Sequence, residues 1–114
     1  MDLDEFQRLA WRTSGRFTER DLRLHAIIGL AAEAGEAADL LKKVEFFGHP
    51  LDPAKLAYEL GDVLWYLAET ASAYGLSLND IAEGNVAKLR ARYPEGFTSE
   101  ASIARADVAA KEIA

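Results

Sequence analysis

The chain has 114 residues, a net charge of −6 and no cysteine, and 50% of its residues are hydrophobic while 28% are charged. This length and composition predict one soluble globular domain. The negative charge argues against a nucleic-acid polymer as the main partner. The absence of cysteine excludes disulfides and thiolate metal sites, and no apolar run approaches the ~20 residues of a membrane span. We therefore expect a cytoplasmic protein that does not bind membranes.

The first half of the chain predicts two helices separated by a polar loop. Asp2 and Glu5 have the spacing of a capping box at the start of a first helix, which is expected over residues 2–13. Asp21 is expected to cap a long second helix that ends between residues 44 and 47. The expected core stripe of this second helix contains Ile27, Leu30, Ala31, Ala34, Ala38 and Leu41.

Residues 48–53 form the clearest break in the sequence. Asp52 followed by Pro53 is a typical helix start, and Gly75 follows the expected end of this third helix near Tyr74. The short connection predicts that the second and third helices are antiparallel neighbours.

The last part of the chain predicts a fourth helix and a tail. The helix is expected to open at Asn79 or Asp80 and to stop before Pro94. We predict one domain over residues 1–97, followed by a tail over residues 98–114 that is helical or forms an interface.

Two short acidic repeats stand out within the second and third predicted helices. Glu33-Ala-Gly-Glu36 and Glu59-Leu-Gly-Asp62 each place two carboxylates on one helix face, because residues three apart are neighbours there. Four carboxylates on adjacent helices suggest a site for a hard cation, Mg²⁺ or Mn²⁺, rather than zinc. The alternative is a set of surface acids in salt bridges with nearby lysines. A ferritin-like di-iron site is disfavoured because neither histidine follows a glutamate by three residues.

A third block completes a pattern that resembles a known family. Gly29 to Glu36, Glu59 to Leu67, and the run Asn85-Val-Ala-Lys88-Leu-Arg-Ala-Arg92-Tyr-Pro94 look like the MazG-like nucleotide pyrophosphohydrolases. The resemblance covers about residues 4–97. It implies an all-α, four-helix bundle with two long antiparallel metal-binding helices. It also implies a homodimer or homotetramer and Mg²⁺-dependent hydrolysis of nucleoside triphosphates to monophosphate and pyrophosphate, with Mn²⁺ as a possible substitute.

The resemblance also assigns roles to individual residues. It makes Glu33, Glu36, Glu59 and Asp62 the metal ligands and the catalytic set, and it places Asn85, Lys88 and Arg92 near the sugar and phosphates of the substrate. The family often has two adjacent acids at the start of its first block, and Ala32 stands where the first of them would be. This difference leaves the general base unassigned.

Three residues in the N-terminal part are candidates for contact with the base. Phe17 or Trp11 could stack on it, and Gln7 could read its edge, although packing and solvation are ordinary roles for such residues. The resemblance therefore implies a pyrophosphohydrolase that cleans the nucleotide pool. The alternatives are a phosphoribosyl-ATP pyrophosphohydrolase or dUTPase-like enzyme of the same fold, or a catalytically silent helical oligomerisation module.

Overall fold

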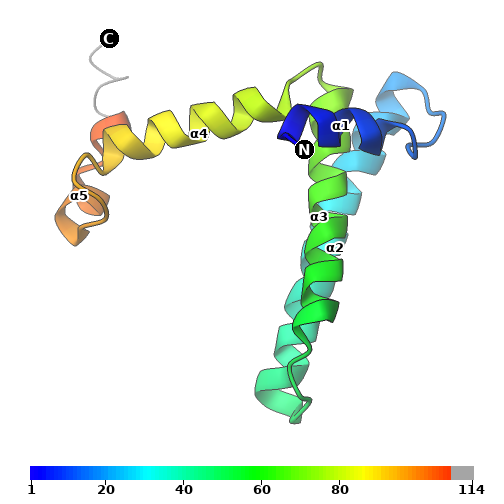
Figure 1. The fold of residues 1–114 in the computed structure, drawn as a ribbon, viewed down its shortest axis with the longest axis horizontal. Helices are drawn as coiled ribbons and strands as arrows, with labels where there is room; N and C mark the ends of the chain where they lie inside the picture. Colours follow the sequence, from blue (N-terminus) through cyan, green and yellow to red (C-terminus); the bar gives the residue numbers. More distant parts are fainter. Residues whose placement is uncertain (109–114) are drawn as a thin grey trace. The chain divides into compact units, whose positions relative to one another are not determined.

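A computed structural model describes residues 1–108, so the last six residues of the predicted tail lie outside the described part. This part contains five helices and no strand, which confirms the all-α prediction (Figure 1). The helices are α1 (Leu3–Trp11), α2 (Glu19–Phe47), α3 (Pro53–Ala73), α4 (Leu78–Arg92) and α5 (Ser99–Ala104). None of the described helices is long and apolar enough to cross a membrane.

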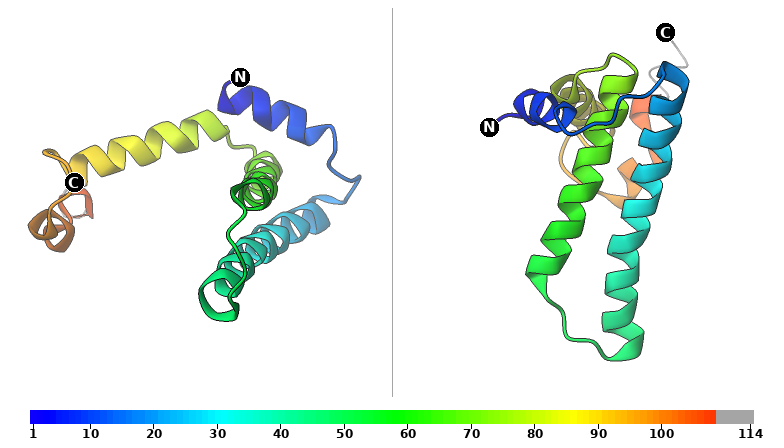
Figure 2. Two further views of the ribbon diagram at one scale, coloured as in Figure 1. Left: turned by 60° about the horizontal axis from the view of Figure 1, so that its bottom comes forward. Right: turned by 90° about the vertical axis from the view of Figure 1, so that its right-hand side faces the viewer.

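The chain forms two compact units, Met1–Leu78 and Asn79–Ala114. In the first unit, α2 and α3 run antiparallel side by side, and α1 packs against α3 (Figure 2). This confirms the predicted pairing of the two long helices. The bundle of four helices stays a prediction, since α4 belongs almost entirely to the second unit. The domain boundary at residue 97 also stays a prediction.

Local signals set most of the helix ends. The Asp2 carboxylate accepts a hydrogen bond of 2.8 Å from the Glu5 amide, and the Asp52 carboxylate accepts one of 3.0 Å from the Ala54 amide. Gly48 ends α2 in the left-handed conformation, with φ of 71°. These caps lie where the sequence placed them, because capping depends on only a few neighbouring residues.

The start of α2 was predicted wrongly. The helix begins at Glu19 and Thr18 caps it, while the expected cap, Asp21, is inside the first turn. The Thr18 hydroxyl accepts a hydrogen bond of 3.2 Å from the Asp21 amide. Threonine and aspartate are both good capping residues, and an aspartate in the first turn also favours the helix dipole. The helix therefore gains three residues at this end.

The face of α2 that packs on α3 also differs from the predicted core stripe. Ala26 and Ala37 are the buried residues of this helix. Ile27, the first residue of the predicted stripe, is 50% exposed, and Leu41 at its other end is 41% exposed. The predicted stripe is therefore apolar but is not covered by α3. Within the first unit, α2 has two apolar faces, and α3 covers one of them.

Gly29 on α2 leaves room for the Tyr66 ring of α3 to pack against the helix backbone. A Cβ atom at this position would lie 2.0 Å from Cε1 of Tyr66, so a larger residue would displace that ring. We expect Gly29→Ala to destabilise the fold by overpacking that costs ~1–3 kcal/mol, offset by ~1 kcal/mol of helix propensity. Thermal melting should show a midpoint several degrees lower.

Gly84→Ala is the matched control for that substitution. Gly84 is also inside a helix, but an added Cβ there meets nothing within 4 Å. Its melting midpoint should rise slightly, because alanine favours the helix over glycine. An equal rise for Gly29→Ala would show that Tyr66 does not pack on Gly29.

Candidate metal centre

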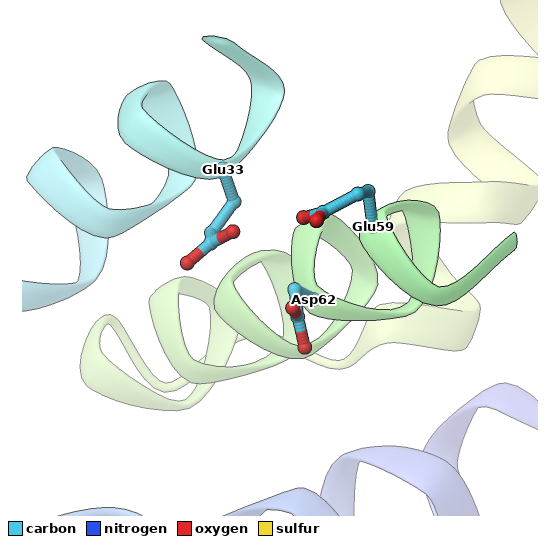
Figure 3. Close-up of side chains that lie close together, drawn as sticks. All are labelled: Glu33, Glu59 and Asp62. Atoms are coloured by element: carbon cyan, nitrogen blue, oxygen red, sulfur yellow. The ribbon is translucent and has the colours of Figure 1, made fainter. Parts of the chain in front are cut away.

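Three carboxylates meet between the two long helices of the first unit. Glu33 on α2 and Glu59 and Asp62 on α3 each offer one oxygen, and these oxygens all lie within 4.8 Å of one another. Figure 3 shows Glu33 across from the two acids of the other helix. All three residues are half-buried. We call these three residues the carboxylate trio.

The register of the two helices brings the trio together. Gly29 meets Tyr66, and one helical turn along, Glu33 meets Asp62. Because Glu33 is further from the connection than Asp62 is, the antiparallel helices must be offset, and the sequence alone left this open. The contact of the small Gly29 with the Tyr66 ring holds this offset.

The electrostatics of the trio suit a cation. Partial burial, followed by the negative charges of Asp62, Glu59 and Glu36, raises the pKa of Glu33 above its ordinary value. The donors are oxygens only, which is the set that hard divalent ions prefer. The residues present therefore fit a Mg²⁺ or Mn²⁺ ion, which would relieve the repulsion between the carboxylates.

Glu36, the fourth predicted ligand, stands apart from the trio in this chain. It is exposed and lines a hollow of about 470 Å³ next to the connection between α2 and α3, together with Glu59, Lys43, Lys55 and His49. Glu59 therefore belongs both to the trio and to this hollow. The structure leaves Glu36 within reach of the same region but outside the group of converging oxygens.

The raised pKa of Glu33 predicts that its negative charge destabilises the fold when no metal is bound. A carboxyl with a raised pKa binds its proton more tightly in the folded chain, so its ionisation lowers the stability as the pH rises through that range. At neutral pH without metal, we expect Glu33→Gln to melt at the same temperature as the wild type or higher. Added Mg²⁺ or Mn²⁺ should raise the midpoint of the wild type but not of the variant.

Glu45→Gln serves as the control for that measurement. Glu45 is an exposed glutamate on the same helix, outside the trio. It should keep the full metal-dependent rise. An unchanged metal response in Glu33→Gln would remove Glu33 from the site.

The three N-terminal candidates have different surroundings. The Gln7 side-chain nitrogen donates to the Ser72 hydroxyl (3.0 Å) and the Leu76 carbonyl (2.8 Å), and its oxygen accepts from the Leu78 amide (2.8 Å). These contacts favour a structural role for Gln7, which ties α1 to the end of α3. Trp11 and Phe17 are about half exposed and line one hollow of about 590 Å³. Their contact with a base remains a prediction.

The three candidates in the third sequence block all lie on α4, in the second unit. Asn85 and Lys88 are exposed there. Arg92 instead forms a bidentate pair with Asp107, through Nε to Oδ1 (2.9 Å) and NH2 to Oδ2 (3.0 Å). Hydrogen bonding to Arg92 holds the pKa of Asp107 well below its usual range. A phosphate would have to displace this carboxylate before it could use the same guanidinium fork.

Sequence reasoning missed one buried polar network in the first unit. Glu69 on α3 is 3% exposed, and its carboxylate accepts a hydrogen bond of 2.7 Å from the Ser14 hydroxyl. Its other oxygen lies 2.5 Å from Nδ1 of His25 on α2. The only signal in the sequence was a glutamate within the apolar run 63–71 of the third helix, and its partners are distant in sequence.

Comparison with known proteins identifies the family. Residues 24–97 match the MazG nucleotide pyrophosphohydrolase domain, and this range contains the carboxylate trio, Glu36 and the α4 candidates. The chain belongs to the MazG nucleotide pyrophosphohydrolase family. This confirms the resemblance drawn from the three sequence blocks.

A phage protein is among the relatives of this MazG chain. The Gene 37 protein of Mycobacterium phage L5 is 33% identical over 76 residues, which cover 63% of this chain and 67% of the phage protein. No solved structure gives a significant match. MazG proteins generally depend on divalent cations, and in the described part of this chain the trio is the group of acids that could hold one.

Proposed function

We propose that this protein hydrolyses nucleoside triphosphates to monophosphate and pyrophosphate with the help of Mg²⁺. The observation that carries the proposal is the carboxylate trio, three convergent acids within the matched MazG domain. Glu33, Glu59 and Asp62 would hold the ion, and Glu36 is close enough to the same region to contribute. Clearing unwanted triphosphates from the nucleotide pool is the role we infer for such an activity.

The proposed reaction breaks the bond between the α-phosphorus and the oxygen that leads to the β-phosphate. A water oxygen attacks the α-phosphorus, pyrophosphate leaves, and the water proton passes to a base. A divalent ion bound at such a site neutralises phosphate charge and lowers the pKa of water. Because Ala32 carries no acid, Glu36, which lies outside the trio, is our candidate for the group that accepts this proton.

The other proposed contacts come from α4. Lys88 offers a positive charge for the pyrophosphate that leaves, and Asn85 offers an amide for the sugar. Arg92 would contribute only after it parts from Asp107. Lys88 is therefore the cation that we rank first for the substrate.

The products of the reaction test this proposal. We expect the protein to release pyrophosphate and monophosphate when Mg²⁺ or Mn²⁺ is added to a panel of canonical, deoxy and oxidised triphosphates, and phosphorus NMR can identify both products. The panel should contain dUTP and phosphoribosyl-ATP, because enzymes of the same fold act on such substrates. Release of inorganic phosphate alone would contradict cleavage between the α- and β-phosphates. No turnover with any nucleotide would favour a silent helical module.

We also propose that the protein works in the cytoplasm as a homodimer or homotetramer. The apolar residues that are buried in the described chain are few and mostly small: Ala10, Ala26, Ala37, Ala68, Ala71 and Leu78. Apolar side chains on the outer face of α2 remain exposed, as do Ile81, Val86 and Leu89 on α4. A second copy of the chain is the simplest cover for these faces.

A further inference from the structure

The buried Glu69 has no role in the proposed hydrolysis. It lies about two helical turns from Asp62 on α3, between the core residues Ala68 and Ala71, with 3% of its surface exposed. In the described chain its carboxylate is satisfied by the Ser14 hydroxyl and by the His25 imidazole. A glutamate is rarely buried at such a site unless its partners hold it there.

Fold stability does not account for this glutamate. Replacing a buried hydrogen-bonded pair by apolar groups of the same shape is often neutral or stabilising, because desolvation offsets the attraction. What the pair does provide is a fixed position for two other groups. It holds the imidazole of His25 by one nitrogen, and it ties the loop that contains Ser14 and Phe17 to α3. The Trp65 indole adds a second tie, a 2.8 Å hydrogen bond to Thr13.

His25 belongs to a row of rings that leads from this loop to the carboxylate trio. Its ring centroid lies 4.7 Å from that of Phe17, with an interplanar angle of 31°, and 5.6 Å from that of Tyr66. Tyr66 in turn packs against Gly29, one helical turn from Glu33, and burial and then the charges of Glu33, Glu69 and Asp62 raise its pKa. His25 and Glu33 are eight positions apart on α2, which is about 12 Å along the helix axis. This span is on the scale of a nucleotide.

The contact with Glu69 also decides what the imidazole can recognise. Nδ1 faces the Glu69 carboxylate, which can only accept, so of the two neutral tautomers this contact selects the one with the hydrogen on Nδ1, which leaves Nε2 as an acceptor. The His25 side chain keeps 36% of its surface exposed, whereas that of Glu69 keeps 1%. The ring is therefore available to a ligand, and the carboxylate behind it is not.

We propose that His25 reads the nucleobase, that Glu69 positions it, and that the pair favours bases with an exocyclic amino group. This inference rests on the proposed function, because it assumes that the trio holds the phosphate end of the nucleotide. Glu69 acts only through His25 and the loop, so it is a positioning residue and not a catalytic one.

Two pairs of substrates isolate the amino group. Deoxycytidine and deoxyuridine triphosphates differ at the 4-amino group, and deoxyadenosine and deoxyinosine triphosphates differ at the 6-amino group. With Mg²⁺, the wild type should show a KM about tenfold lower for the amino member of at least one pair, the effect of one hydrogen bond in a binding site. Its kcat should differ little within that pair.

Two variants test the residues separately. His25→Phe keeps a ring against Phe17 but removes both nitrogens, and Glu69→Met keeps a long side chain but removes the carboxylate. In each variant the two members of a substrate pair should have about the same KM, so that the tenfold preference is lost. The kcat at saturation should stay within about threefold of the wild type. Thr70→Val is the control, because it removes only the hydrogen bond from Thr70 to the Tyr66 carbonyl beside the pair. This control should retain the full preference.

A binding measurement separates this inference from the proposed function. Calorimetry can compare the binding of the monophosphates dCMP and dUMP, or of dAMP and dIMP, without any turnover. The wild type should bind the amino member of the pair more tightly. Both variants should bind the two members equally. If no triphosphate is hydrolysed, the proposed function fails and the monophosphates alone decide this inference. Equal KM and equal binding within both pairs, a preference for the keto member, or an unchanged preference in His25→Phe would overturn it. If Glu69→Met does not fold, His25→Phe carries the test.

Discussion

Replacing Asp62 by asparagine is expected to lower pyrophosphohydrolase activity about a thousandfold while the helix content stays unchanged. Asp62 is the residue of the trio that faces Glu33 across the two helices, and asparagine keeps its shape but loses the charge. A thousandfold loss corresponds to about 4 kcal/mol of transition-state stabilisation, a magnitude that fits the loss of a metal ligand. Steady-state release of pyrophosphate and circular dichroism measure the two quantities.

Asp39→Asn is the matched control for this substitution. Asp39 is also a half-buried acid on one of the long helices, but it pairs with Lys42 (2.8 Å) and Lys43 (3.0 Å) and is outside the trio. Its replacement should change turnover by less than tenfold. If Asp62→Asn retained activity like this control, the trio would not be the catalytic metal site.

Glu36→Gln distinguishes the two roles that Glu36 could have. If Glu36 is a ligand, the variant should lose both turnover and the metal-dependent rise in melting temperature. If it accepts the water proton, it should lose turnover and keep that rise, because the trio alone would hold the ion. The position of Glu36 outside the converging oxygens leads us to expect the second result.

The parts of the fold that were predictable depend on residues close together in sequence. Asp52 and Pro53 start α3, and Gly48 and Gly75 follow the two long helices in the left-handed conformation, so these ends could be predicted from short segments. The carboxylate positions were predictable for the same reason, since a spacing of three fixes neighbours on one helix. Their convergence was not, because the offset between α2 and α3 depends on how Gly29 packs against Tyr66.

The errors arose where tertiary contacts decide between equivalent local choices. Both faces of α2 are apolar, so periodicity could not show that α3 covers Ala26 and Ala37 rather than the stripe around Ile27. The phosphate contact assigned to Arg92 from its place in a motif stays a prediction, and the motif could not show that its guanidinium pairs with Asp107, fifteen residues later. Ala32 remains the departure from the family pattern that matters most. Its methyl side chain can neither bind a metal ion nor accept a proton, as the acid that often stands there could.

Replacing Ile27 by glutamate is expected to break the proposed homo-oligomer. Ile27 is a half-exposed residue at the start of the uncovered stripe of α2, and its neighbours Leu24 and Ile28 are 41% and 64% exposed. A charge there would be buried against a second copy of the chain without a partner. Wild-type protein should have the mass of two or four chains in light scattering and a melting midpoint that rises with concentration. The variant should be monomeric and melt at least ~10 °C lower, since ~4–8 °C corresponds to 1 kcal/mol in a domain of this size.

The same glutamate at Ala32 separates loss of the interface from the effect of an added charge. Ala32 is exposed on the same helix, on the flank that carries Glu36 rather than on the stripe of Ile27. Ala32→Glu should therefore keep the mass of the wild type. A monomeric wild type, or equal masses for wild type and Ile27→Glu, would contradict self-association through α2. The exposed stripe would then need a different partner, because α3 leaves it uncovered in the described part of the first unit.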